Sequence, residues 1–203
     1  MPPYMSTANF ITLARLPLLG LVAWLLYFPG GPAAWVALGL LPVLFLMDWA
    51  DGYMARGRGQ VSGLGGVLDI AMDRVVENVL WVVFAHQGLV PVWVPILFIA
   101  RSFLVDGLRG YALAQGHSAF GMMHSRAGRF LVAGRLMRGL YGLAKGFSFG
   151  GLALLVALGG AARPATPGLD LAVRLLVYCS VGLCVIRGVP VLLDARALLN
   201  DAV

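Results

Sequence analysis

The chain has 203 residues, 60% of them hydrophobic and 12% charged, and its net charge of +6 comes almost wholly from arginine because Lys145 is the one lysine. Soluble domains carry about 25% charged residues, so this composition excludes an ordinary soluble domain and indicates a polytopic membrane protein, with a very apolar soluble bundle as the minor alternative. The chain is too short for two membrane domains, so we expect a single domain over residues 1–203.

Six apolar segments follow one another along the chain, each long enough for the ~20 residues that a membrane-spanning helix needs. They lie at residues 10–28, 33–56, 65–87, 91–115, 129–160 and 169–193. The breaks between them read "FPGGP", "RGRGQVSG", "HQGLVP", "QGHSAFGMMHS" and "GGAARPATPG", and their glycines and prolines are typical of helix ends. We therefore predict an all-α integral membrane protein with six transmembrane helices.

Arginines in the breaks predict how these helices are oriented. The breaks after the first and third segments contain no arginine or lysine, whereas Arg56 and Arg58 lie in the second break and Arg109 and Arg126 bound the fourth. Because cytoplasmic loops carry an excess of positive charge, we expect the second and fourth breaks and both termini to face the cytoplasm. Arg163 is a single exception on the opposite side.

Four aspartates lie at the cytoplasmic ends of the second and third segments. On a helix, Asp48 and Asp51 share one stripe at i and i+3, and Asp69 and Asp73 share another at i and i+4. Antiparallel helices joined by the short loop at 57–64 would turn the two stripes toward each other. Carboxylates that converge in this way cannot all stay ionised without cations between them. Two hard divalent ions such as Mg²⁺ or Mn²⁺ meet that need and are the usual arrangement for displacement at phosphorus.

The same stretch resembles the signature of a known family. It reads Asp48-x2-Asp51-Gly52-x2-Ala55-Arg56-x8-Gly65-x3-Asp69-x3-Asp73. This pattern is similar to that of the CDP-alcohol phosphatidyltransferases at every fixed position, and eight such positions rarely match by chance. The resemblance implies a bundle of six membrane helices and a homodimer with a cytoplasm-facing polar cavity in each protomer.

The resemblance also implies a role for each matching residue. The residues implied to hold two Mg²⁺ or Mn²⁺ ions are Asp48, Asp51, Asp69 and Asp73. Those implied to contact the CDP moiety are Gly52, Ala55, Arg56 and Gly65. Asp73 is further implied to be the general base that takes the proton of the acceptor hydroxyl. The alternatives are arginine-paired helix charges for the aspartates and a helix-packing role for the glycines and Ala55.

The implied reaction is the transfer of a phosphatidyl group. The metal ions neutralise the diphosphate of CDP-diacylglycerol, and Asp73 activates an alcohol whose oxygen attacks the β-phosphorus, which bears the diacylglycerol. CMP then leaves with its charge held by metal and Arg56, so that most of the catalysis is positioning and electrostatic stabilisation. The lipid tails would stay in the bilayer, which explains why the carboxylates lie at membrane depth.

Arginines in the second half of the chain predict an anionic acceptor. Arg101 and Arg109 are eight residues apart, roughly on one helical face. Their stretch, "ARSFLVDGLRGYALAQG", resembles the corresponding one in phosphatidylglycerolphosphate synthases. The resemblance implies a pocket for the phosphate of glycerol 3-phosphate, to which guanidinium groups are suited, with Arg126 and Arg129 as further candidates. Anchoring at lipid headgroups is the alternative, and for Arg126 and Arg129 it is equally open.

The second half of the chain departs from the synthase pattern in several places. Ser102 replaces the glutamate that usually follows the first arginine, Asp106 stands where serine is common, and "SRAGR" replaces a lysine-rich turn. Inositol-phosphate synthases share the "LDxxxDR" ending seen here from Asp69 to Arg74. Inositol phosphate is therefore the nearest alternative acceptor.

The N-terminal run "NFITLAR" resembles the family's first helix, which lies by the nucleotide site. Its polar residues are Asn9, Thr12 and Arg15. Helix capping or headgroup anchoring is an equally open role for Asn9 and Arg15.

Two other classes of membrane protein also place carboxylates in helices. A prenyltransferase binds diphosphate through aspartates, but it would need a longer chain and has no use for Gly52 or Arg56. A metal or proton transporter would explain the aspartates but not the arginines of the second loop. We therefore expect an enzyme of the cell (inner) membrane with its active site on the cytoplasmic side. Its expected partners are CDP-diacylglycerol, a small phosphorylated alcohol, membrane lipids and a second copy of the chain, and no nucleic acid.

Overall fold

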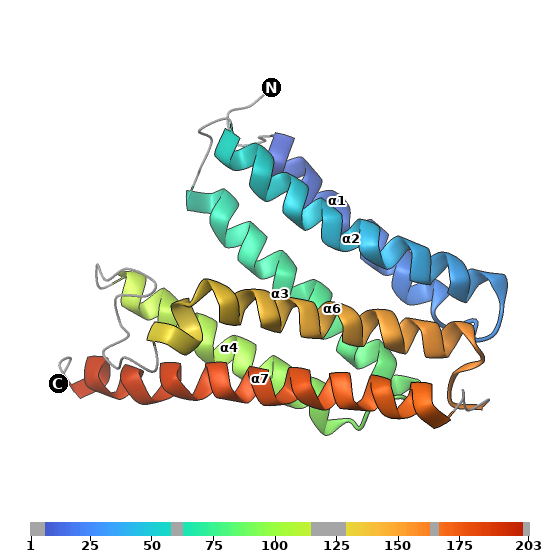
Figure 1. The fold of residues 1–203 in the computed structure, drawn as a ribbon. Coiled ribbons are helices and arrows are strands. Elements are labelled where there is room, and N and C mark those ends of the chain that lie inside the picture. Colours follow the sequence, from blue (N-terminus) through green and yellow to red (C-terminus); the bar gives the residue numbers. More distant parts are fainter. Residues whose placement is uncertain (1–6, 58–62, 115–128, 163–166, 201–203) are drawn as a thin grey trace. The chain divides into compact units, whose positions relative to one another are not determined.

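The computed structural model describes the backbone of residues 7–57, 63–114, 129–162 and 167–200, and side chains within these ranges except at 7–11, 48–57, 63–65, 114, 129, 133, 135, 162 and 195–200. In this part of the chain every regular element is helical and no strand is present, which confirms the predicted all-α class. The elements are α1 (Thr7–Leu25), α2 (Pro32–Gly57), α3 (Gly63–His86), α4 (Trp93–Ala114), the π-helical turn η1 (Arg129–Ala133), α6 (Arg135–Ala157), the short 3₁₀ turn η2 (Gly160–Ala162) and α7 (Pro167–Asn200) (Figure 1).

Most helices begin and end close to the predicted apolar segments. α2 and α3 cover the segments predicted at 33–56 and 65–87 and leave a short connection between them, as expected. α7 continues to Asn200, beyond the predicted end at 193. The run after Pro190, "VLLDARALLN", is less apolar but consists largely of good helix formers. The helix therefore continues beyond the end of the apolar segment.

The segment predicted at 129–160 is not one continuous helix, because η1 and α6 meet at Gly134. The Gly134 N–H donates to the Phe130 carbonyl at 3.1 Å, and the Gly134 carbonyl accepts from the Arg138 N–H at 3.1 Å. A Cβ at residue 134 would collide with the carbonyl oxygen of Phe130. Glycine is therefore needed where the wider π-helical turn rejoins the α-helix, a requirement that the apolar pattern does not reveal.

Replacing Gly134 with alanine is expected to destabilise the fold by about 1–3 kcal/mol, because the backbone must shift to relieve this collision. The matched control is Gly139→Ala, since Gly139 lies in α6 with no atom near its added Cβ. That variant should be neutral or more stable by up to about 1 kcal/mol. Thermal unfolding of both variants in detergent measures the difference, and equal midpoints would contradict the packing argument.

The chain divides into two compact units. The first comprises Met1–Val92 and Phe149–Asp170, and the second comprises Trp93–Ser148 and Leu171–Val203. The first unit therefore contains α1, α2, α3 and the end of α6. The second contains α4, η1, the start of α6 and most of α7.

Aromatic packing holds the first unit together. The ring centroid of Phe149, from α6, lies 4.6 Å from that of Trp81 in α3 and 6.2 Å from that of Phe45 in α2. α1 packs along both α2 and α3, and Figure 1 shows α1 and α2 side by side. The Gln87 side chain, just beyond α3, donates from Nε2 to the carbonyl of Leu26 at 3.0 Å. The aromatic contacts and the Gln87 bond fix the C-terminal half of α3, and the predicted aspartates lie in its N-terminal half.

In the second unit a buried arginine fastens α7 to the junction of η1 and α6. Arg187 of α7 donates from Nη1 to the carbonyl of Leu131 at 2.8 Å and from Nη2 to the carbonyl of Val132 at 3.2 Å. A small apolar cluster surrounds this junction; its buried members are Val105, Ala112, Val132 and Val191. Arg187 thus supplies donors where the change of helix type interrupts the regular bonding.

Two helices in the described part of the chain are long and apolar enough to cross a membrane, Leu136–Ala157 and Pro167–Asp194. Shorter apolar stretches lie at Thr12–Leu25 and Pro32–Met47. α3 and α4 each carry several charged residues within their length. The full set of six spans stays a prediction.

Candidate active site

α3 carries two of the predicted metal-binding aspartates on one face. Asp69 and Asp73 are both half-buried, and their i, i+4 spacing places them one turn apart on the same side of the helix. Glu77 follows at the same spacing and is buried. The carboxylates therefore form a line along α3. Glu77 was missed in the sequence interpretation, although the repeated spacing of four was the signal that could have found it.

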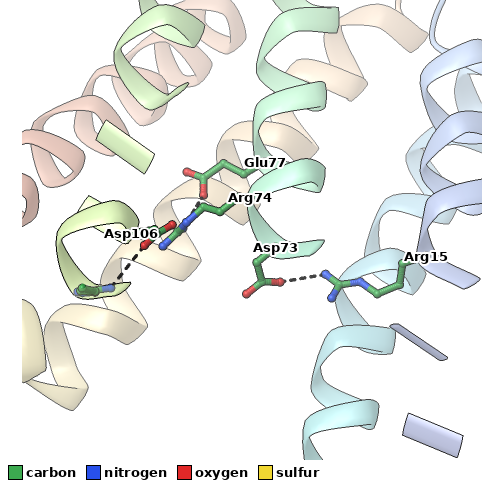
Figure 2. A network of polar contacts seen from close by, with 6 residues as sticks. Arg15, Asp73, Arg74, Glu77 and Asp106 are labelled. Atoms are coloured by element: carbon green, nitrogen blue, oxygen red, sulfur yellow. Dashed lines mark hydrogen bonds and ion pairs between the residues drawn. The ribbon is translucent and has the colours of Figure 1, made fainter. Parts of the chain in front are cut away.

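Asp73 makes an ion pair with an arginine of another helix. Arg15 Nη2 of α1 lies 3.1 Å from Asp73 Oδ1 of α3; the Arg15 side chain is 1% exposed and that of Asp73 is 46% exposed. Figure 2 shows the two side chains pointing toward each other from their helices. Arg15 is therefore buried in an ion pair inside the protein, a role that differs from the helix capping and headgroup anchoring considered from the sequence.

A second pair lies next to this one along α3. Arg74 Nη1 donates to Glu77 Oε2 at 3.3 Å, at i, i+3 spacing (Figure 2). The Glu77 carboxylate is almost fully buried, whereas Arg74 is partly exposed. Because each residue neutralises the other, this pair adds no net charge to the aspartate face.

The other half of the predicted donor site lies on α2 and at the start of α3. The backbone is helical there, as predicted. The residues whose side chains lie outside the described part of the chain are Asp48, Asp51, Gly52, Ala55, Arg56 and Gly65. Their convergence with Asp69 and Asp73 therefore stays a prediction.

The donor set on α3 fits a hard divalent cation in its chemistry. Asp69 and Asp73 offer carboxylate oxygens, which are the ligands that Mg²⁺ and Mn²⁺ prefer. Among the side chains that the structure describes, no group of three or more histidine, cysteine or acidic residues is gathered to hold a metal ion. Asp48 and Asp51, the other two predicted ligands, are not among those side chains.

Two of the four arginines predicted to bind the acceptor have described side chains, and both lie on α4. Arg109 Nη1 is 3.8 Å from Asp106 Oδ1, a loose ion pair at i, i+3 spacing. Arg101 lies two turns earlier, with its Nε buried and without a hydrogen-bond partner among the described residues. The side chains of Arg126 and Arg129 lie outside the described part of the chain.

Three cations of the second unit gather around one buried tyrosine, an arrangement called here the Tyr141 cluster. Lys145 Nζ lies 4.4 Å from the Tyr141 ring centroid, Arg187 Cζ 5.5 Å and Arg101 Cζ 5.9 Å. The ring's negative face attracts each cation, but three positive charges at such distances also repel one another. An anion such as a phosphate would relieve that repulsion.

α7 makes room for Arg101 in this cluster through a glycine. A Cβ at Gly188 would lie 3.1 Å from Arg101 Cγ and 3.7 Å from its Nε. Gly188 and Arg187 both belong to the last apolar segment, and neither they nor Lys145 were identified as site residues from the sequence. The signal that could have found Arg187 and Lys145 is a cation deep inside an apolar segment, which is rare and usually functional.

Comparison with known proteins found a family model and several relatives that match this chain. The family model of CDP-alcohol phosphatidyltransferase matches residues 5–162. The chain is 30% identical over 166 residues to the CDP-diacylglycerol–glycerol-3-phosphate 3-phosphatidyltransferase of Bacillus subtilis (strain 168), covering 74% of this chain and 86% of that relative. It is also 31% identical over 117 residues to a cardiolipin synthase (CMP-forming) of Streptomyces coelicolor, covering 56% of this chain and 54% of that protein.

The match to a third relative covers a shorter part of the chain. The CDP-diacylglycerol–glycerol-3-phosphate 3-phosphatidyltransferase of Rickettsia typhi is 27% identical over 103 residues, which cover 51% of this chain and 58% of that protein. The family match includes every position of the aspartate signature and confirms the resemblance found in the sequence. The chain therefore belongs to the CDP-alcohol phosphatidyltransferase family, transferases of phospholipid biosynthesis.

Proposed function

We propose that this protein transfers the phosphatidyl group of CDP-diacylglycerol to the hydroxyl of glycerol 3-phosphate and releases CMP. The observation that carries the acceptor is the match to the Bacillus subtilis glycerol-3-phosphate enzyme, which extends over 86% of that relative. The Tyr141 cluster supports the same acceptor, because three neighbouring cations favour a phosphate and would repel a cationic alcohol.

The proposed site has a donor half and an acceptor half. The residues proposed to hold two Mg²⁺ or Mn²⁺ ions are Asp48, Asp51, Asp69 and Asp73. Those proposed to receive the CDP moiety are Gly52, Ala55, Arg56 and Gly65. Those proposed to receive the acceptor phosphate are Arg101, Arg109, Arg126 and Arg129. When bound, the cations supply charge neutralisation at the diphosphate.

Asp73 accepts the proton of the acceptor hydroxyl in the transfer step. The acceptor oxygen forms a bond to the β-phosphorus, which bears the diacylglycerol, and the bond from that phosphorus to the oxygen bridging it to CMP breaks. CMP leaves with the bridging oxygen, and Arg56 balances its charge. Proton transfer to a positioned carboxylate contributes about 10²–10⁴-fold to the rate, and the arginines contribute by fixing the acceptor in line.

The same proposal places the whole chain in the cell membrane as one domain of six transmembrane helices, paired with a second copy. Both termini and the active site face the cytoplasm. The distribution of arginines among the loops supports this orientation. Lipid contact would explain why large apolar side chains are exposed, such as Phe103 at 74% and Phe147 at 62%.

An assay of the purified protein in detergent tests the acceptor. The protein receives labelled CDP-diacylglycerol, Mg²⁺ or Mn²⁺, and one of three acceptors: glycerol 3-phosphate, myo-inositol 1-phosphate or choline. CMP release is expected with glycerol 3-phosphate alone, together with a new phosphorylated lipid. Release with myo-inositol 1-phosphate alone would overturn the acceptor, and no release with any acceptor would overturn the transferase function.

A second candidate is cardiolipin formation, which the match to the Streptomyces coelicolor enzyme favours. If CDP-diacylglycerol donates a phosphatidyl group and CMP leaves, atom balance makes phosphatidylglycerol the acceptor. The same assay with phosphatidylglycerol distinguishes the two candidates. A rate with this lipid above that with glycerol 3-phosphate would replace the first proposal by the second.

A further inference from the structure

A buried arginine of the first helix contacts the proposed general base. The Arg15 side chain is 1% exposed and its Nη2 lies 3.1 Å from Asp73 Oδ1. A buried charge is strongly unfavourable unless it is paired, and apolar residues of similar volume often replace a buried ion pair without loss of stability. A contribution to stability alone therefore does not explain this ion pair.

Other contacts already hold α1 in place beside α3. Leu19 and Val22 of α1 are buried in the first unit, and α1 packs along α3. The bond from Gln87 Nε2 to the carbonyl of Leu26 ties the far ends of the two helices together. Arg15 is thus not needed to join these helices, and its charge calls for another explanation.

The geometry of the pair leaves part of Asp73 accessible. Arg15 engages one carboxylate oxygen, Oδ1, and Figure 2 shows the second oxygen directed away from the guanidinium. A carboxylate can accept at both oxygens, and the Asp73 side chain is 46% exposed. Arg15 therefore holds the carboxylate from its buried side and leaves the other side for a ligand.

Arg15 also completes the charge balance of the proposed site. Four aspartates and the two charges of a diphosphate diester give six negative charges, and two divalent cations return four. The remaining two match Arg15 and Arg56, since Arg74 is neutralised by Glu77. Without Arg15, the donor-bound site would keep one uncompensated negative charge in a partly buried position.

We propose that Arg15 is a positioning residue of the transfer reaction, an inference that rests on the proposed function. It orients Asp73 to accept the proton, and it supplies one of the two protein cations that balance the donor diphosphate. Arg15 repels the metal ions but aids turnover. Its removal should therefore raise the affinity for metal and lower the rate of transfer. A residue that only stabilises the fold would not do so.

Mn²⁺ binding without substrate provides a readout apart from activity. Purified Arg15→Gln is titrated with Mn²⁺ and the free ion is followed by electron paramagnetic resonance. We expect about tenfold tighter binding than in the unchanged protein, which is the effect of one charge close to a divalent ion in a wet site. Arg15→Lys, which keeps the charge, should bind Mn²⁺ within about twofold of the unchanged protein.

Turnover at saturating metal provides the second readout. Arg15→Gln should lower kcat by about tenfold to a hundredfold, the usual loss when a reacting group is displaced, with the KM for the acceptor unchanged within about twofold. Arg15→Lys should recover part of kcat. The matched control is Arg174→Gln on the exposed side of α7, which should change neither Mn²⁺ affinity nor kcat.

Two results would overturn the inference. One is a normal kcat in Arg15→Gln, and the other is unchanged or weaker Mn²⁺ binding. If Arg15→Gln fails to fold, the Mn²⁺ affinity and kcat of Arg15→Lys provide the test. A loss of both Mn²⁺ binding and turnover in Arg15→Lys would contradict the proposal. Failure of the proposed function is separate, because it would remove turnover from the unchanged protein while leaving the Mn²⁺ titration interpretable.

Discussion

Replacing Asp73 with asparagine is expected to lower kcat at least about a thousandfold. The substitution keeps the shape of the side chain but removes the charge that accepts the hydroxyl proton, a loss that alone is worth about 10²–10⁴-fold. It also removes one carboxylate from the proposed metal site and leaves Arg15 buried beside a neutral amide. The two losses act on the same step, so they reinforce each other.

Acceptor-dependent CMP release measures this effect at saturating CDP-diacylglycerol. The control is Asp170→Asn, because Asp170 lies in the first turn of α7 and contributes at most about 1 kcal/mol through the helix dipole. That variant should keep normal turnover. If Asp73→Asn releases CMP at a rate near normal while remaining folded, Asp73 is not the base.

Replacing Arg101 with methionine is expected to raise the KM for glycerol 3-phosphate by about tenfold to a hundredfold. A charge-assisted hydrogen bond contributes about 1.5–3 kcal/mol, and each 1.4 kcal/mol is a factor of ten in affinity. Arg101 belongs to the Tyr141 cluster, and its Nε is buried without a hydrogen-bond partner in the described part of the chain. Arg187, in contrast, already donates to two backbone carbonyls.

Steady-state kinetics with each substrate varied in turn provide the measurement for Arg101. The KM for CDP-diacylglycerol is the internal control and should stay within about twofold, because the donor binds in the other half of the proposed site. Gly188→Ala offers a matched variant, since its Cβ would press on the Arg101 side chain without removing the charge. It should raise the same KM by a smaller factor. An unchanged acceptor KM in Arg101→Met would exclude this arginine from the phosphate pocket.

Much of this protein can be predicted from its sequence, because the informative features are local. Apolar length and the glycines and prolines between segments are properties of short stretches, so the all-α class and the bounds of α2 and α3 follow from them. The aspartate signature is equally local, which is why it identified the family from residues 48–73 alone. Helical spacing likewise placed Asp69 and Asp73 on one face.

Features that depend on residues far apart in the chain were decided only by the tertiary structure. Helical periodicity gives the face of a residue but not its partner on another helix, so the contact of Arg15 with Asp73 could not be predicted. The same holds for the cations that meet at Tyr141 from three helices. The break at Gly134 depends on a backbone oxygen one turn away, which no hydrophobic pattern encodes. Local patterns thus determine the helices and the family, whereas packing between helices determines which charges meet.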